Sequence, residues 1–304
     1  MTTDNPAMAE ALRQALLRAN PDLSRFDPLP RIISHDDFSR GFCGWSQLVG
    51  NYEDDLDGML PGYAQHTSAM LSTLAHWEAG SHGGMDSSYA LKLASQPKAG
   101  AQNVTIKRHT FRKRGPIRFE AYVTFKPEAN ELKLSETDVR AFGIAFDLQG
   151  GDRDAGNERV MPHLRFLSAE NGKHVQKWQF KSETTPFKTF GGAPSPEAAK
   201  TVSHYHLSPE GWRDLPDGAQ RLCYNEIPTK VNWTYLCLDF DLETMKATGF
   251  RCNDRVFDMS GYDSIRIKAM KNLWCMLNFL FFVETDTDKR AFLYIDSVCI
   301  SGDF

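Results

Sequence analysis

Strict alternation of apolar and polar residues in two neighbouring runs constrains the fold most. In residues 117–125 (IRFEAYVTF) every odd position is apolar, and in residues 140–148 (RAFGIAFDL) the large apolar residues occupy every second position from Phe142 on. Successive side chains of a strand point to opposite faces, so each run predicts a β-strand with one face in a core. The other face of the second run carries Ala141, Gly143 and Ala145 before Asp147. These small residues predict space for a ligand across the sheet.

Similar patterns recur along the chain and predict the other strands. They cover residues 31–38, 67–75, 89–94, 105–111, 161–168, 173–180, 231–242, 248–258, 273–284 and 291–300. Many short strands separated by Gly- and Pro-rich turns are typical of an all-β sandwich or barrel. Residues 7–20 instead carry Leu12, Leu16 and Leu17 at helical spacing and stop at Pro21, which predicts one amphipathic helix.

The chain of 304 residues has room for one large β-domain. We expect residues 1–30 to form the helix and a linker, and residues 31–304 to form a single domain. Within it, residues 181–229 contain six prolines and are predicted to be a long insertion. Connections of that length in compact domains are usually functional loops or lids.

Charge and cysteine content exclude several functions. A net charge of −4 argues against a general nucleic-acid binder, and the basic cluster 107–114 is interpreted as a solvated hairpin. The longest apolar run, 273–283, is too short to span a membrane, and no secretory signal is visible. Six cysteines without a CxxC pair indicate reduced thiols of a cytoplasmic protein. We therefore expect no nucleic-acid or membrane partner, and leave homo-oligomerisation open.

The two ends of the β-region resemble a known architecture. The opening stretch SHDDF (34–38) with Gly44-Trp45 and the closing stretch FLYIDSVCI (292–300) are similar to the first and last strands of jelly-roll, concanavalin A-like sugar-binding domains. The resemblance spans about residues 30–304 and implies a jelly-roll β-sandwich of two antiparallel sheets. Lectins, carbohydrate-binding modules, glucanases and polysaccharide lyases share it, so it implies a carbohydrate ligand without fixing an activity.

Alternation also places polar side chains opposite the core, and we predict that they line one ligand-binding cleft. Aromatic rings beside hydrogen-bonding groups suit a sugar, whose C–H face stacks on rings. The alternative is an ordinary solvated sheet face. The predicted substrate-binding residues are Arg118, Tyr122, Arg165, Lys177, Gln179, Tyr235 and Asn278, with His204 and His206 from the insertion.

The leading functional hypothesis is a glycoside hydrolase acting on an oligosaccharide or glycoside. Such enzymes need two carboxyl groups about 5–5.5 Å apart for retention or about 6.5–9.5 Å apart for inversion. The candidates are Glu120, Asp147, Asp239 and Glu284. The alternative for each of them is a structural salt bridge with Arg118 or Arg165. The segment ETDTD (284–288) is similar to the E-x-D-x-x-E motif of glucanases with this fold, and matches it at Glu284 and Asp286 only.

Three alternatives stay open at this point, one of which is an interaction protein whose N-terminal helix docks a partner. A lyase would use a His or Tyr base with a cation that neutralises a uronate carboxylate, and His163, Arg165 and Lys177 supply these types. A lectin-like protein would bind sugar without turnover, and would use Tyr122 and Tyr235 as stacking platforms.

A structural Ca²⁺ site is a further expectation. Asp36, Asp37 and Asp296 lie in the two terminal strands, which neighbour each other in many sandwiches of this kind. Carboxylate oxygens are ligands that Ca²⁺ prefers. The alternative is that Asp36 or Asp37 caps a turn.

Overall fold

The computed structural model describes residues 5–47, 51–52, 70–72, 87, 89–110, 112–130, 133–134, 137–150, 158–183, 202–203, 209–222, 232–269 and 275–304. Within these ranges the chain forms one helix, α1 (Pro6–Ala19), and a series of β-strands. The Asn5 side chain caps the first turn of α1 by accepting a 3.2 Å hydrogen bond from the backbone of Ala7. Asn20, which precedes Pro21, is extended and ends the helix, as predicted.

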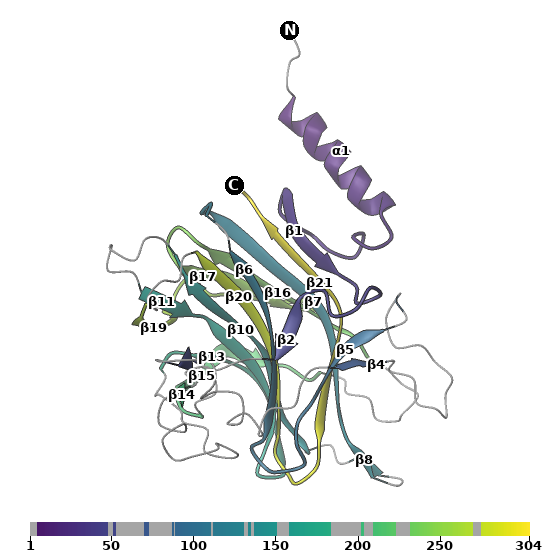
Figure 1. Cartoon of the computed structure of the whole chain (residues 1–304), viewed down its shortest axis with the longest axis vertical. Coiled ribbons are helices and arrows are strands. Elements are labelled where there is room, and N and C mark those ends of the chain that lie inside the picture. The colour runs from purple at the N-terminus through teal and green to yellow at the C-terminus, as the bar shows by residue number, and fades with distance from the viewer. Residues whose placement is uncertain are drawn as a thin grey trace.

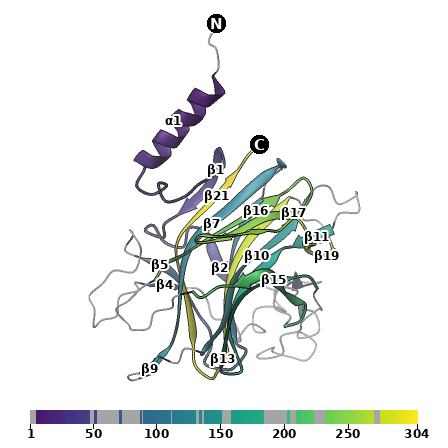
Figure 2. The same ribbon diagram turned by 180° about the vertical axis from the view of Figure 1, so that it is seen from behind.

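The described strands form two large antiparallel sheets that pack face to face (Figures 1 and 2). Sheet A has the order β18 (Arg255–Asp258), β17 (Lys246–Cys252), β16 (Thr234–Asp241), β7 (Pro116–Pro127), β21 (Ala291–Gly302), β5 (Ala90–Ala94) and β4 (Met70–Ser72), with β1 (Arg31–Asp36) paired to β21. The first and last long strands are therefore neighbours, as the resemblance implied.

Sheet B has the order β15 (Trp212–Ala219), β13 (Lys173–Lys181), β12 (His163–Glu170), β10 (Val139–Gln149), β20 (Met276–Thr285), β6 (Gln102–Thr110) and β2 (Trp45–Gln47). β11 (Glu158–Met161) and β19 (Ile265–Lys268) extend it beside β10. Two short pairs complete the strands: β3 (Asn51–Tyr52) with β14 (Val202–Ser203), and β8 (Ala129–Asn130) with β9 (Lys133–Leu134).

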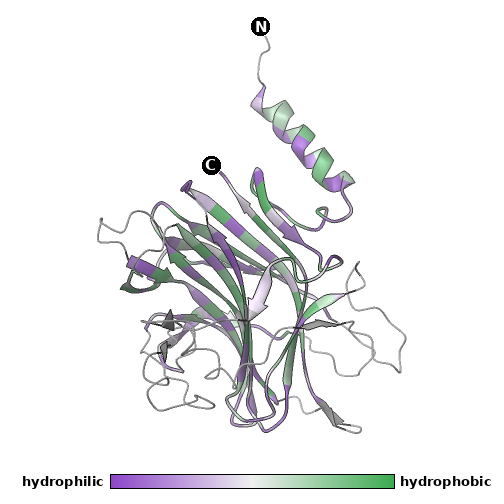
Figure 3. Ribbon diagram, in the orientation of Figure 1, coloured by the Kyte–Doolittle hydropathy of each residue, from purple (hydrophilic) through white to green (hydrophobic). Residues whose placement is uncertain are grey.

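The main core lies between the two sheets. The inward positions of β7 and β10 meet there, so that Phe119 and Phe146 have their ring centroids 5.4 Å apart. Alternating hydropathy along these strands is visible in Figure 3. The all-β sandwich with an N-terminal helix is therefore confirmed. Phe142, Ile144 and Phe146 all lie in the main core, as the predicted period of two requires.

Some strands differ from the predicted ones. The predicted strand 248–258 is a hairpin of β17 and β18, because Asn253 adopts a positive φ of 52° in the turn. Similarly, Pro162 separates β11 from β12. The predicted insertion 181–229 contains β15, which pairs with β13. Alternation missed β15 because Pro216 and Gly218 interrupt it, and such residues are tolerated in an edge strand.

Candidate functional site

The residues predicted to line one cleft come from the outer faces of two different sheets. β7 and β16 place five of them on the face of sheet A that points away from the core: Arg118, Glu120, Tyr122, Tyr235 and Asp239. β10, β12, β13 and β20 place seven on the outer face of sheet B: Asp147, His163, Arg165, Lys177, Gln179, Asn278 and Glu284. The prediction of one shared face is therefore wrong, because the main core separates the two. His204 and His206 lie outside the described residues.

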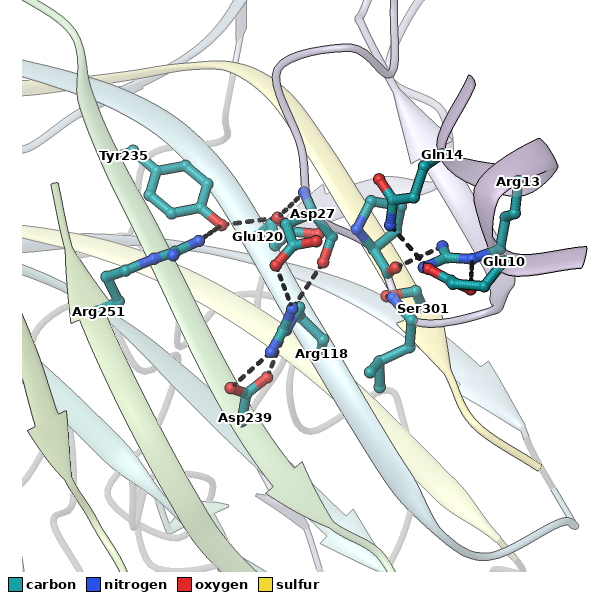
Figure 4. Close-up of polar contacts among 12 residues, drawn as sticks. Glu10, Arg13, Gln14, Asp27, Arg118, Glu120, Tyr235, Asp239, Arg251 and Ser301 are labelled. Carbon is teal, nitrogen blue, oxygen red and sulfur yellow. Dashed lines mark hydrogen bonds and ion pairs between the residues drawn. The ribbon is translucent and has the colours of Figure 1, made fainter. Parts of the chain in front are cut away.

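On sheet A, the chain's own N-terminal segment, residues 25–29, covers the predicted side chains (Figure 4). The backbone of Asp27 donates to Glu120 Oε1 at 2.8 Å, and the Tyr122 hydroxyl donates to the carbonyl of Arg25 at 2.9 Å. Leu29 donates from its backbone to Ser301 Oγ at 2.9 Å. This part of the sheet face is therefore bound by the linker that follows α1.

Glu120 is fully buried beneath that segment. Its Oε1 also accepts a 2.6 Å hydrogen bond from Tyr235, whose hydroxyl accepts one of 2.9 Å from Arg251. Its Oε2 has no partner among the described residues. Burial raises the pKa of Glu120, against the opposing effect of the two hydrogen bonds.

Asp239 is held by Arg118 in a two-point ion pair, with nitrogen–oxygen distances of 2.7 and 3.1 Å (Figure 4). The hydrogen bond to Asp239 raises the pKa of Arg118 above its ordinary value. Arg118 also donates to the carbonyl of Asp27 at 2.7 Å, which fastens the N-terminal segment to the same pair. Arg118 and Asp239 thus connect the linker to the sheet.

The four predicted catalytic carboxylates do not form an accessible pair. On β10, Glu284 lies opposite Ala141 and Asp147 opposite Asn278, a separation of six residues or roughly 20 Å along the strand. That exceeds the spacing of about 9.5 Å that inversion tolerates. Glu120 and Asp239 lie diagonally on β7 and β16, at roughly 7–8 Å. Both are engaged by the N-terminal segment and its partners.

Asp147 is also occupied, since Arg159 binds both of its oxygens at 2.5 Å in a fully buried pair. A carboxylate whose two oxygens are both bound by a buried arginine is poorly placed to contact a substrate. Of the four carboxylates, Glu284 is the one on sheet B that remains a candidate.

The small residues of β10 are explained by packing rather than by an open cleft. A Cβ added to Gly143 would lie 2.8 Å from the Phe282 ring and 2.1 Å from the carbonyl of Leu164. Phe282 and Leu280 pack with Ala145 in a second apolar cluster on the outer face of sheet B. The space above Gly143 is thus filled by Phe282, so the ligand space predicted there is not found.

Beside this cluster, two buried cations lie against one indole ring. The guanidinium carbon of Arg165 is 4.3 Å from the ring centroid of Trp212, and Lys181 Nζ is 4.9 Å from it. Gln179 accepts a 2.7 Å hydrogen bond from Arg165 Nε and donates one of 2.7 Å to Asp214. Burial lowers the pKa of Lys181 to about 8 and the pKa of Arg165 to about 10.

Arg165 lacks an anionic partner in the described part of the chain. Its side chain is 7% exposed, and no described carboxylate lies within ion-pair distance of it. Lys181 donates to the carbonyl of Glu210. The hydrogen-bond partner of the buried Arg165 guanidinium, Gln179, is neutral. Burying a cation in this way is costly, and an anion that binds beside Arg165 removes that cost.

Glu284 lies on the same face, in a cluster around Arg140. Arg140 nitrogens are 3.0 Å from Glu284, 3.3 Å from Asp286 and 2.6 Å from Glu170. Gln102 donates to Glu284 at 3.2 Å. Desolvation raises the pKa of Glu284 in spite of these neighbours, so its carboxyl retains a proton to higher pH than an exposed one.

The three carboxylates predicted to bind Ca²⁺ do not form one ligand set. Asp36 accepts from Trp45 at 3.0 Å and from Lys107 at 2.5 Å, so its charge is neutralised within the protein. Asp37 caps the turn at Ser39, and Asp296 accepts from Ser87 at 2.9 Å. The described residues contain no group of three or more His, Cys, Asp or Glu side chains that could hold a metal ion. These donors therefore do not fit a calcium ion.

Five cysteines are free thiols, and Cys237, Cys252 and Cys299 among them are buried, while Cys223 lies outside the described residues. In the part of the chain that the structure describes, no helix is long and apolar enough to cross a membrane.

Three residues of the sheet B site were not predicted. Trp212 and Lys181 lie in the predicted insertion. Arg140 lies in the predicted strand 140–148 but is not among the predicted site residues. Lys181 could have been found, since Lys177, Gln179 and Lys181 continue one alternating pattern past the end of the predicted strand. Trp212 had no such signal, because Pro216 and Gly218 interrupt the alternation of apolar and polar residues in its strand, β15.

The two antiparallel sheets and the pairing of the first long strand with the last define the chain as an all-β sandwich. More particularly, the chain belongs to the family described as "Domain of unknown function (DUF6772)", whose model matches residues 13–304. No curated protein matches the sequence.

Several solved structures are similar in fold. The potassium-bound carbohydrate recognition domain of Emp46p is 10% identical, with 91% of this chain and 97% of that chain covered and a TM-score of 0.36. A structure from work on endo-acting O-glycanases of the human gut microbiota is 11% identical, with coverages of 89% and 98% and a TM-score of 0.38. The basic winged bean lectin with Tn-antigen is 8% identical, with coverages of 84% and 98% and a TM-score of 0.34. At such identities the likeness concerns the fold alone.

Proposed function

We propose that the protein binds an acidic saccharide on the outer face of sheet B, beside Arg165 and Trp212. The observation that supports this most is the buried guanidinium of Arg165, which has a neutral hydrogen-bond partner in Gln179 and no described carboxylate within ion-pair distance. A sugar carboxylate or sulfate would supply the missing charge, and planar oxyanions match the arginine fork.

The surroundings of Arg165 favour a sugar over a small inorganic anion. Trp212 is partly exposed, and its ring lies beside the buried ring of Phe282 at a centroid distance of 6.2 Å. Gln179 and Asp214 add hydrogen-bonding groups at its edge. Aromatic rings beside planar polar groups are suited to the C–H faces and hydroxyls of a sugar ring.

A binding assay tests this proposal. Affinity for uronic acid-containing and sulfated oligosaccharides, measured by titration calorimetry, should exceed the affinity for neutral oligosaccharides of the same length. Arg165→Gln should lose at least tenfold in affinity, because one charge-assisted contact to a buried group contributes about 1.5–3 kcal/mol.

Arg213→Gln is the matched control, since Arg213 follows Trp212 on β15 but is exposed and pairs with Glu183. It removes the same charge and should leave the affinity unchanged. Equal affinity for neutral and acidic sugars, or equal losses in both variants, would refute the proposal.

A second candidate function is hydrolysis of the bound saccharide with Glu284 as the general acid. The specific observation in its favour is the raised pKa of Glu284, two residues before Asp286 and linked to it through Arg140. Mass spectrometry of the same oligosaccharides after incubation distinguishes the two functions. Products that have gained water and that disappear in Glu284→Gln would support hydrolysis, whereas products with an unsaturated sugar would indicate a lyase.

A further inference from the structure

A groove lies at the end of the sandwich where six strands of the two sheets begin or end. β6, β10 and β16 end there, and β7, β17 and β20 begin there. Two adjoining hollows of about 60 and 190 Å³ make up the groove. Both are lined by Arg114, Gly150, Leu242 and Met245. The groove is separate from Arg165, Trp212 and Glu284.

The floor of the groove is apolar and continuous with the main core. Leu148 and Leu277 line the groove and belong to the core between the sheets. Leu242 and Met245 line it too and pack against that core. An apolar group in the groove would therefore extend the interior of the protein, and methionine side chains adapt readily to such a group.

The rim of the groove is basic, although the whole chain carries a net charge of −4. Arg112, Lys113 and Arg114 are exposed, and none of them forms a hydrogen bond or ion pair with the described residues. Arg266 lies on the other side and pairs with Glu158 at 3.0 Å. Glu158 is the one carboxylate among the described lining residues, against four cationic side chains, so this lining has a net positive charge.

We propose that this groove binds an amphiphilic anion with a single alkyl chain, such as a fatty carboxylate. The head group is placed among Arg112, Lys113 and Arg114, which supply the complementary charge. The alkyl chain lies against the apolar side chains of Leu242 and Met245 on the floor of the groove. A bare anion would leave this floor exposed to water, and a neutral alkyl chain would leave the three cations without a partner.

The test uses hexanoate, octanoate and decanoate, each below its micelle concentration, with titration calorimetry of the full chain. Affinity should rise with chain length, by up to about fourfold for each methylene that is fully buried. Decanol, which has the chain without the charge, should bind at least tenfold more weakly than decanoate. Chain-length-independent binding, or equal binding of decanol, would overturn the proposal.

Variants locate the site. Arg112→Gln and Arg114→Gln should each weaken decanoate binding several-fold and reduce its dependence on salt. Arg40→Gln is the matched control, because it removes the same charge from an exposed turn outside the groove. If all three variants bound decanoate equally, the rim assigned here would be wrong.

A second readout does not depend on any substitution. Cys275 lines the groove and is partly exposed, whereas Cys43 is partly exposed elsewhere. Bound decanoate should slow the alkylation of Cys275 by iodoacetamide, mapped by peptide mass spectrometry, and leave Cys43 unaffected. Protection of both cysteines or of neither would contradict binding in this groove.

Discussion

The Tyr235 hydroxyl donates a 2.6 Å hydrogen bond to the same Glu120 oxygen that accepts from the backbone of Asp27. A residue of β16 and a residue of the N-terminal segment thus share one buried carboxylate on β7. Because desolvation is the largest influence on Glu120 and raises its pKa, the ionised form is disfavoured in the folded protein. The role of Glu120 in holding the linker leads to the first prediction.

Glu120→Gln is expected to leave the free energy of unfolding at pH 7 unchanged or to raise it, since the amide oxygen accepts both hydrogen bonds without a buried charge. Glu120→Ala should lower it by about 2–4 kcal/mol, because two donors lose their partner and a cavity forms. Urea unfolding at pH 7 measures both values. Comparable destabilisation by the two variants would show that the negative charge itself stabilises the fold.

The same pair of proteins tests the sign of the pH dependence. A raised pKa means that folded Glu120 keeps its proton above the ordinary value of 4.5, at which the unfolded chain loses it. Stability of the wild type should therefore fall, relative to Glu120→Gln, as the pH rises from 4.5 to the raised pKa. A difference that stays constant over this range would contradict the assignment.

Gly143→Ala should destabilise the protein strongly, by about 2–4 kcal/mol, because the new methyl group overlaps the Leu164 carbonyl and the Phe282 ring. Gly249→Ala is the matched control: its Cβ would lie 3.6 Å from Asp239, an ordinary contact. Thermal unfolding compares the two. Adding Phe282→Leu to Gly143→Ala should restore part of the loss only, since the backbone carbonyl remains in place.

Lys181 gives a prediction in the alkaline range. Burial lowers its pKa to about 8 from the ordinary value of 10.5, so the unfolded chain binds a proton that the folded chain releases between these values. The contribution of Lys181 to stability should therefore rise with pH from about 8 to about 10.5. The difference in unfolding free energy between wild type and Lys181→Met isolates this contribution from other lysines, such as Lys126, that titrate in the same range.

The affinity of the proposed site for an acidic saccharide should change with pH in the opposite direction to the stability. Because the cationic form of Lys181 is needed for an anionic ligand, this affinity should fall as the pH rises through about 8. Lys181→Arg should keep the affinity to higher pH, because an arginine stays charged. Identical pH profiles of wild type and Lys181→Arg would show that Lys181 does not contact the bound anion.

Strand positions and core residues could be predicted from the sequence because alternation is a local property. Trp178 illustrates the limit: its position between Lys177 and Gln179 does not decide which way its ring points, and the structure places it in the main core. Alternation also assigns a side chain to a face of its strand without saying which sheet the strand joins. Glu120 and Arg165 were therefore predicted on one cleft, although β7 pairs with β16 and β21, and β12 with β10 and β13.

The sequence predicted that an arginine would be a partner of the carboxylates, but it did not predict their other partners. Arg118 was named as an alternative partner for the predicted catalytic carboxylates, and it does bind Asp239. The covering of Glu120 by Asp27 could not be read from the pattern, since 93 residues separate them. Contacts between an irregular linker and a sheet face have no period, and such contacts decide here which polar face is accessible.

The helix α1 carries its apolar stripe on the solvent side, which leads to a last prediction. Met8, Leu12 and Leu16 follow each other at intervals of four residues and are 73%, 61% and 63% exposed. α1 projects from the sandwich in both views of the chain (Figures 1 and 2), and none of its residues is buried. Helical periodicity predicted the helix, and the packing partner normally implied by such a stripe is not found among the described residues.

Replacing Leu12 and Leu16 together by Gln should change the free energy of unfolding by no more than about 0.5 kcal/mol per residue, because neither side chain is buried. Phe26→Ala, in the linker that follows, should cost about 3 kcal/mol, since Phe26 is buried between Tyr122 and His35 at ring distances of 5.6 and 5.7 Å. Unfolding at two protein concentrations checks both values. A large, concentration-dependent loss in the Leu12/Leu16 variant would mean that the stripe is buried between chains in solution.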